Sequence, residues 1–115
     1  MNGKKVLVIV TVSLLALAGV YLNKVIRSRR QRIDKYDRAY EGLKIGDSRA
    51  VVVSAMGEPH EVTGCPYTPF ADPKEEAEFR SKCFQEYEYV ELMVRYTISF
   101  DRSGAVIYKS KAVSP

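Results

Sequence analysis

The sequence contains few of the residues from which reactive sites are built. Its 115 residues include two cysteines, one histidine and no tryptophan. Two cysteines and His60 are too few for a zinc site with four protein ligands. No serine, cysteine or second histidine stands at a spacing that completes a catalytic triad, and no glycine-rich phosphate-binding loop is present. We therefore expect no catalytic residue, no metal, no cofactor and no enzyme activity.

The histidine has acidic neighbours. Glu58 and Glu61 flank His60, and such a group could act as a general base or as half of a metal site. A single surface histidine beside a turn explains the same pattern more simply. We therefore place no reactive site at His60.

A net positive charge is missing from most of the chain. Residues 1–35 contain eight Lys and Arg against one acid, a net charge of +7, whereas residues 36–115 contain ten against thirteen, a net charge of −3. A nucleic-acid-binding protein carries its basic residues on the folded surface. This distribution argues against a nucleic-acid partner, and nothing in the sequence indicates a small-molecule substrate.

A long uncharged run is present instead, near the N-terminus. It covers residues 6–22, which as a helix would extend for about 25 Å, near the lower limit for crossing a bilayer. The run can extend to residue 26 while the Lys24 side chain reaches the interface. The sequence therefore predicts a basic flank over residues 1–5 and a transmembrane anchor over residues 6–26. A cleaved signal peptide is the alternative, because Ala16, Ala18 and Gly19 fit a cleavage site.

A basic juxtamembrane segment over residues 27–35 follows the run. We expect five of the basic side chains to contact lipid headgroups, namely Lys24, Arg27, Arg29, Arg30 and Arg32. Together with the apolar run, the part of the chain expected to contact membrane lipid covers residues 6–32. By the positive-inside rule, this cluster favours a domain facing the cytoplasm. The cysteine pair and the cleavage pattern favour the other side of the membrane, in an oxidising compartment.

Two helices are predicted before the sheet. Apolar residues at steps of three and four share one helical face, namely Ile33, Tyr36, Tyr40 and Leu43. A second, short helix fits residues 47–56, with Asp47 or Ser48 as its cap and with Gly57 and Pro59 ending it. The β-branched run at residues 51–53 leaves a strand as the alternative.

Residues 64–83 form a predicted insertion that the two cysteines bracket. Within it, Asp72 is expected to cap a helix whose first residue is Pro73, with Glu75 closing a capping box. A disulfide between Cys65 and Cys83 would close a loop of nineteen residues and stabilise the fold by ~3 kcal/mol. Two unpaired thiols are the alternative.

The clearest pattern is a strand over residues 92–101, in which apolar residues alternate with mostly polar ones. Such alternation is typical of a half-buried antiparallel strand. Residues 86–91 and 105–113 are expected to form the strands on either side of it, and a hairpin turn at residues 101–104 joins it to the second of them. Residues 60–64 could form a further short strand. The predicted fold is thus α+β: a transmembrane helix followed by a two-layer ααβββ domain, residues 36–115, with a three-stranded antiparallel meander.

The motifs in this order resemble the BamE family (SmpA/OmlA-like) of small bacterial envelope proteins. They comprise a Gly-Asp-Ser turn, a short helix, a Gly-Glu-Pro turn and a Phe-Asp-x-x-Gly-x-Val turn between strands. The matching residues are Tyr40, Leu43, Gly46, Asp47, Val53, Gly57, Pro59, Tyr96, Phe100, Asp101, Gly104 and Val106. The resemblance covers residues 36–110 and implies an ααβββ fold, a periplasmic location and a non-catalytic role in assembling outer-membrane β-barrel proteins. Family members are typically lipoproteins, whereas this chain lacks the lipid-accepting cysteine.

Together with the cysteine pair and the cleavage pattern, the resemblance leads us to expect a single-pass protein of a bacterial inner membrane with its domain on the periplasmic side. We expect it to act as a scaffold that binds a protein partner in the cell envelope, for example by strand addition at the sheet edge. Candidate partner-binding side chains are Tyr67, Phe70, Tyr87 and Tyr89. One alternative is an inhibitor-like module that fills an enzyme cleft with exposed, rigid Tyr67 and Phe70. Another is a small inner-membrane protein with a cytoplasmic domain and free thiols.

Overall fold

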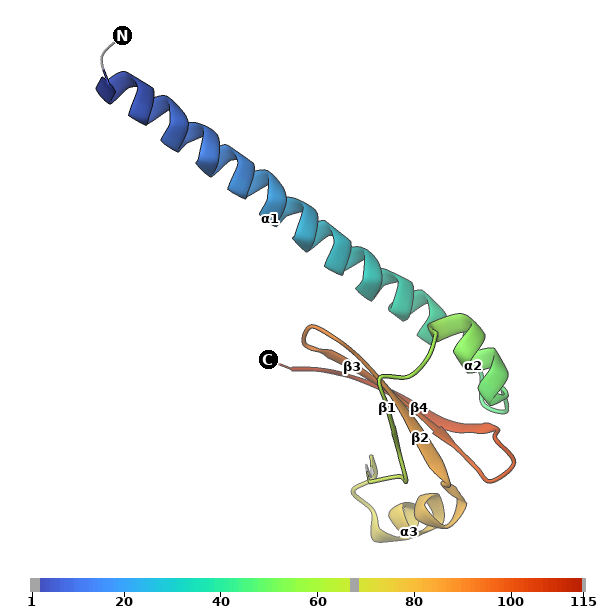
Figure 1. Cartoon of the computed structure of the whole chain (residues 1–115). Coiled ribbons are helices and arrows are strands. Elements are labelled where there is room, and N and C mark those ends of the chain that lie inside the picture. Colours follow the sequence, from blue (N-terminus) through green and yellow to red (C-terminus); the bar gives the residue numbers. More distant parts are fainter. Residues whose placement is uncertain (1–2, 67–68, 115) are drawn as a thin grey trace. The chain divides into compact units, whose positions relative to one another are not determined.

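A computed structural model describes residues 3–66 and 69–114 of the chain. The chain divides into two compact units, Met1–Arg32 and Ile33–Pro115. The elements, labelled in Figure 1, are α1 (Gly3–Gly42), α2 (Arg49–Met56), β1 (Glu61–Thr63), α3 (Pro73–Lys82), β2 (Gln85–Glu91), β3 (Val94–Phe100) and β4 (Val106–Val113).

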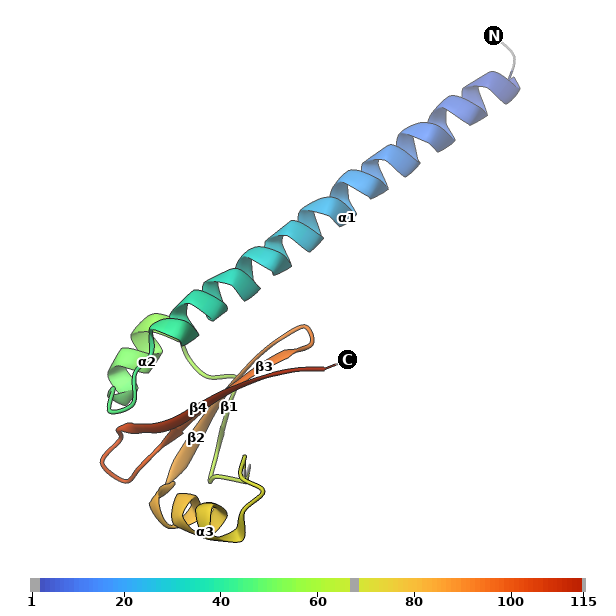
Figure 2. The same ribbon diagram turned by 180° about the vertical axis from the view of Figure 1, so that it is seen from behind.

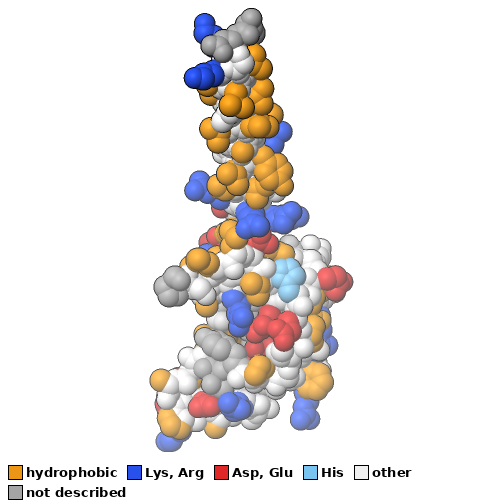
Figure 3. All heavy atoms as spheres, turned by 60° about the vertical axis from the view of Figure 1, so that its left-hand side comes forward, with side chains coloured by type: hydrophobic (Ala, Val, Ile, Leu, Met, Phe, Trp, Pro, Cys, Tyr) orange, Lys and Arg blue, Asp and Glu red, His pale blue; other side chains and the backbone are white. Residues whose placement is uncertain are grey.

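The first unit is the N-terminal part of helix α1. This helix contains an 18-residue window with a mean hydropathy of 2.3, none of it buried. Figure 3 shows apolar side chains along this part, with Lys and Arg side chains at both of its ends. By length and composition the helix could cross a membrane, although a signal sequence near an N-terminus has the same properties.

The second unit contains an antiparallel sheet with the strand order β1-β2-β3-β4. The predicted sheet had three strands, but among the described residues the structure has four. The additional strand is β1, in which Val62 pairs with Tyr87 of β2. The β2–β3 and β3–β4 pairs form the predicted meander, with an irregularity between Ser99 and Phe100. The fold is therefore α+β, as predicted, with one more edge strand.

One face of this sheet packs against the end of α1 and against α2. The core side chains are Leu43, Val52, Met56, Tyr89, Val94, Tyr96, Ile98, Phe100 and Val106, with Ile33, Tyr36, Ala39, Tyr40 and Tyr87 packed against them. The predicted apolar helical face of residues 33–43 is confirmed, because all four of its members belong to this set. In α2, Val52 and Met56 face the core, whereas Ala55 is exposed.

The opposite face of the sheet is also covered, which the alternating pattern did not predict. Thr97 is 4% exposed and Ser99 is wholly buried, although both belong to the predicted polar face. The cover comes from α3 and the segment before it: Phe79 contacts Tyr108, and Phe70 contacts both. Figure 2, seen from behind, shows α3 on the side of the sheet away from α2.

Both short helices have the predicted caps. The Ser48 hydroxyl accepts a bond from the Val51 N–H (3.3 Å), and Gly57 ends α2 with a φ of 85°. The Asp72 carboxylate accepts a bond from the Lys74 N–H (3.1 Å) at the start of α3, whose first residue is Pro73. The strand alternative for residues 51–53 is therefore wrong.

Candidate functional site

The structure brings together two of the three turns that carry the family resemblance. The Gly46 N–H donates to the Val106 carbonyl (2.7 Å), and the Val106 N–H donates to the Asp47 carbonyl (2.8 Å). Ser48 forms an isolated bridge with Ala105. These bonds join the segment before α2 to the start of β4. These motif residues thus attach that segment to the sheet.

The Asp101 side chain organises the β3–β4 turn. Its Oδ1 atom accepts bonds from the Ser103 hydroxyl (2.6 Å) and the Ala105 N–H (3.0 Å). These bonds, the one from Ser103 first, lower the pKa of the Asp101 carboxyl. Gly104 has a φ of +84°, and a Cβ there would lie 3.0 Å from an Arg49 nitrogen. A residue with a side chain would therefore be strained at this position.

The other motif turn supports the aromatic core. Gly57 has a positive φ, and its carbonyl accepts a bond from the Tyr89 hydroxyl (2.9 Å). Burial is the main cause that raises the pKa of Tyr89. Pro59 stands two residues after Gly57 and precedes His60, whose N–H donates to the Glu88 carbonyl (2.9 Å). This turn therefore leads the chain from α2 into β1.

Cys65 and Cys83 lie at disulfide-bonding distance, with 1.95 Å between their sulfur atoms and 6.2 Å between their Cα atoms. A side-chain oxygen of the buried Glu86 lies within 4.8 Å of both sulfur atoms. Among the described residues this is the one group of metal-ligand types at a suitable spacing. Because the sulfur atoms are bonded to each other, they are not thiolates that could bind a metal.

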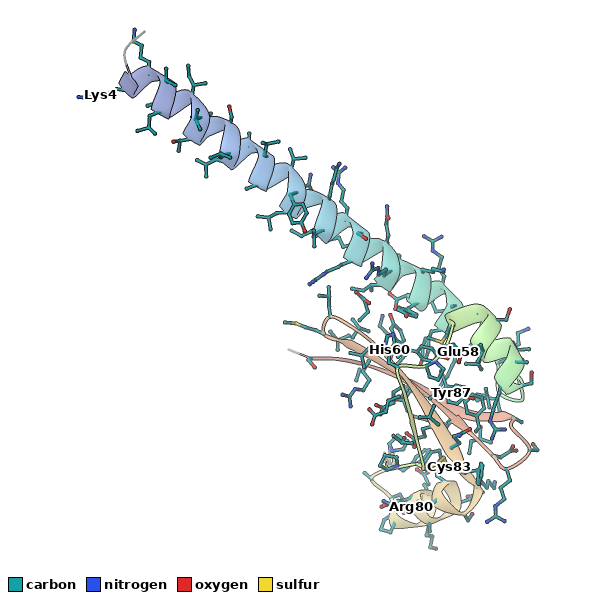
Figure 4. All side chains as sticks on the ribbon, viewed as in Figure 1. Lys4, Glu58, His60, Arg80, Cys83 and Tyr87 are labelled. Atoms are coloured by element: carbon teal, nitrogen blue, oxygen red, sulfur yellow. A yellow bond between two sulfur atoms is a disulfide. The ribbon has the colours of Figure 1, made fainter. Side chains whose placement is uncertain are left out.

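The His60 side chain makes its contacts within the folded unit. Its Nδ1 atom accepts a bond from the Val90 N–H (2.7 Å), and its ring packs edge-on against Tyr36 (6.3 Å between centroids). Figure 4 shows His60 and Cys83 toward different ends of the sheet, so they do not form a nucleophile–base pair. The described structure therefore gives His60 a packing role.

The candidate partner-binding residues have different surroundings. Tyr89 is wholly buried, so its side chain offers no surface to a partner. Tyr87 is half-buried, with its ring 4.7 Å from that of Phe100. Phe70 is half-buried between Phe79 and Tyr108, which argues against its use as an exposed plug for an enzyme cleft. Tyr67 lies outside the described residues.

The candidate headgroup residues all lie on exposed positions of α1, namely Lys24, Arg27, Arg29, Arg30 and Arg32. Three of them, Lys24, Arg29 and Arg32, also line one shallow hollow on the helix surface together with Ser28. Such side chains can contact lipid phosphates beside an apolar span.

A polar network that the sequence did not reveal connects α1 to the sheet. The Asp37 carboxylate accepts bonds from the Tyr96 hydroxyl and from Lys111 Nζ (2.7 Å). These bonds, the one from Lys111 first, lower the pKa of Asp37, while burial is the main cause that raises the pKa of Tyr96. Lys109 Nζ also donates to the Tyr40 carbonyl (2.7 Å).

We expect Asp37→Asn to lower the free energy of unfolding by about 1–2 kcal/mol at pH 7, as for a charged hydrogen bond at a partly exposed site. Since the folded-state pKa is lowered, this contribution is present above about pH 4 and is lost as the pH falls through that pKa. Urea titrations at pH 7 and pH 3 test this, with exposed Asp34→Asn as the control. An equal deficit at both pH values would contradict it.

The last strand leaves an edge open within the described chain. β4 pairs with β3 on one side, and on its other side the turn before α2 bonds only to its first residue, Val106, and to Gly104 and Ala105 just before it. β4 is eight residues long, whereas the other edge strand, β1, has three. A long open edge offers backbone donors and acceptors to an added strand.

No known protein family, curated protein or solved structure matches the chain. The resemblance to BamE proteins therefore stays a prediction from the motif residues. What the structure establishes is an α+β unit with a cysteine pair at bonding distance and an apolar N-terminal helix.

Proposed function

We propose that this chain is a membrane-anchored, non-enzymatic protein of the bacterial cell envelope whose folded unit binds a protein partner. One observation carries the proposal: apolar side chains along α1 are exposed, for example Leu7 (68%), Leu15 (68%) and Leu17 (67%). A helix with such a surface needs lipid or another protein around it. The uncharged run and its basic ends fit a bilayer.

The cysteine pair supports a periplasmic location for the folded unit. Disulfides form and persist in oxidising compartments and are rare in the cytosol. The basic residues after the span favour the opposite orientation. We give the cysteine pair more weight, because the bond would join the segment after β1 to the end of α3. The BamE-like role, support for outer-membrane protein assembly, belongs to this proposal.

The open edge of β4 is the proposed binding surface. Strand addition uses backbone hydrogen bonds along an unpaired edge and needs no reactive side chain. The half-buried Ser110 lies in the middle of that edge strand. Tyr87 and Tyr89 are less suitable, since their rings pack in or against the core.

Site-specific photo-crosslinking in cells tests this surface. A photoreactive amino acid at Ser110 is expected to give a discrete crosslink to a cell-envelope protein. The same group at Glu75, an exposed residue in the first turn of α3, is the control and should give none. Equal products from both positions, or no product from Ser110, would refute β4 as the binding surface.

A further inference from the structure

The β2–β3 turn exposes apolar side chains at one end of the sheet. The exposed fractions are 52% for Leu92, 62% for Met93, 64% for Val113 and 38% for Val90. We call these four residues the apolar tip. They lie at one end of the sheet: Leu92 and Met93 form the turn between Glu91 and Val94, Val90 pairs with Arg95 beside the turn, and Val113 pairs with Val94. The Ser114 N–H also donates to the Met93 carbonyl (2.7 Å).

The backbone of this turn has an unfavourable conformation at Leu92. Leu92 has a φ of 54°, and among the described residues other than glycine only Cys65 shares a positive φ. Two-residue hairpin loops usually place glycine, asparagine or aspartate at such positions. A leucine there is strained, and about half of its side chain stays exposed. Strained residues cluster at functional sites, so the strain points to a role for the exposed side chain.

The apolar tip lies at the end of the sheet where α1 enters the second unit. Lys109 bonds to Tyr40 and Lys111 to Asp37. The two bonds show that β4 runs in the opposite direction to the end of α1. Val113 therefore lies toward the residue-33 end of this helix. Figure 1 shows the β2–β3 turn and the C-terminus at one end of the sheet.

The chain between the span and this unit is short. Residues 26 and 33 both belong to helix α1, and seven helical residues extend for about 10 Å. If residues 6–26 lie in a bilayer, as the proposed function requires, the residue-33 end of the unit stays close to the bilayer surface.

We propose that the apolar tip inserts into the surface of the same bilayer that holds the anchor, giving the folded unit a second membrane contact. Small apolar protrusions bind a lipid interface in proportion to the apolar area they bury. The tip is a protrusion of four side chains, too small to form a stable protein interface. The charges beside it, Glu91 and Arg95, are of opposite sign, so the contact is apolar and requires no anionic lipid.

A fluorescent probe tests this in the full chain. The only two cysteines are bonded to each other, so an introduced cysteine is the single free thiol. An environment-sensitive dye is attached at Met93→Cys, at Leu14→Cys within the span, or at Arg102→Cys. Arg102 is exposed in the β3–β4 turn and is the control at the other end of the sheet.

In phosphatidylcholine vesicles that contain a nitroxide-labelled lipid, we expect quenching of about twofold or more at positions 14 and 93 and none at position 102. Adding Leu92→Gly, which suits the positive φ, should weaken quenching at position 93 without unfolding the chain. Quenching at 14 with none at 93 would overturn the tip contact and leave the anchor standing. No quenching at 14 would overturn both.

Discussion

Replacing both Cys65 and Cys83 by alanine is expected to lower the free energy of unfolding by about 2–5 kcal/mol. The bond closes a loop with a sequence separation of 18, so its loss lets the unfolded chain gain entropy. It also frees the segment that carries α3. Among the residues of that helix, Phe79 alone is buried, so little else holds α3 on the sheet.

Thermal unfolding followed by circular dichroism measures this effect. In a unit of this size each kcal/mol corresponds to a change in Tm of about 4–8 °C, so we expect Tm to fall by about 10 °C or more. A reducing agent should lower the Tm of the unaltered protein to a similar extent. It should leave the double variant unchanged. A variant as stable as the unaltered protein would show that the bond contributes nothing.

Phe100→Ala is expected to lower the free energy of unfolding by about 3–5 kcal/mol, the usual range for a buried phenylalanine. Phe100 is wholly buried. Tyr87 packs against its ring, and the Arg49 guanidinium lies 5.6 Å from the ring centroid. Because Arg49 begins α2 and Tyr87 belongs to β2, the resulting cavity would loosen the helix and the sheet together.

Phe84→Ala is the matched control. Phe84 is 52% exposed, although its N–H donates to the Phe100 carbonyl (2.8 Å). The bond from the Phe84 N–H is kept in alanine, and replacing an exposed side chain usually changes stability by no more than about 0.5 kcal/mol. Urea unfolding of both variants gives the comparison. Equal losses would contradict the position assigned to Phe100 at the centre of the core.

Local signals in the sequence were sufficient to predict the helix caps. Ser48 and Asp72 cap their helices through bonds to N–H groups two or three residues away. Such bonds depend on neighbouring residues alone, so residue type and spacing predict them. The apolar face of residues 33–43 was predictable for the same reason, since it follows from the helical period.

The fourth strand and the second covered face depend on contacts that are distant in the sequence. β1 has only three residues, so the sequence indicated a possible short strand at residues 60–64 but not its pairing at the edge of the sheet. Thr97 and Ser99 alternate with apolar residues as on an exposed face, yet the insertion buries them. Nothing in the strand itself indicates that another segment will cover it.

The sequence also could not show where the β2–β3 turn ends and β3 begins. Leu92 continues the alternation of residues 94–100, so it was predicted to face the core. The structure places it in the turn with a positive φ. The bond from Tyr96 to Asp37 was equally hidden, because it joins residues 59 positions apart. Both features depend on pairing and register.

Thiol labelling of the protein in isolated, unreduced membranes tests the account most directly. A thiol-reactive polymer that adds mass is applied to denatured protein from the membrane fraction, with and without prior reduction. We predict no labelling before reduction and labelling of both cysteines after it, as for an anchored unit in an oxidising compartment. Complete labelling without reduction would contradict the periplasmic account and would favour a domain that faces the cytoplasm.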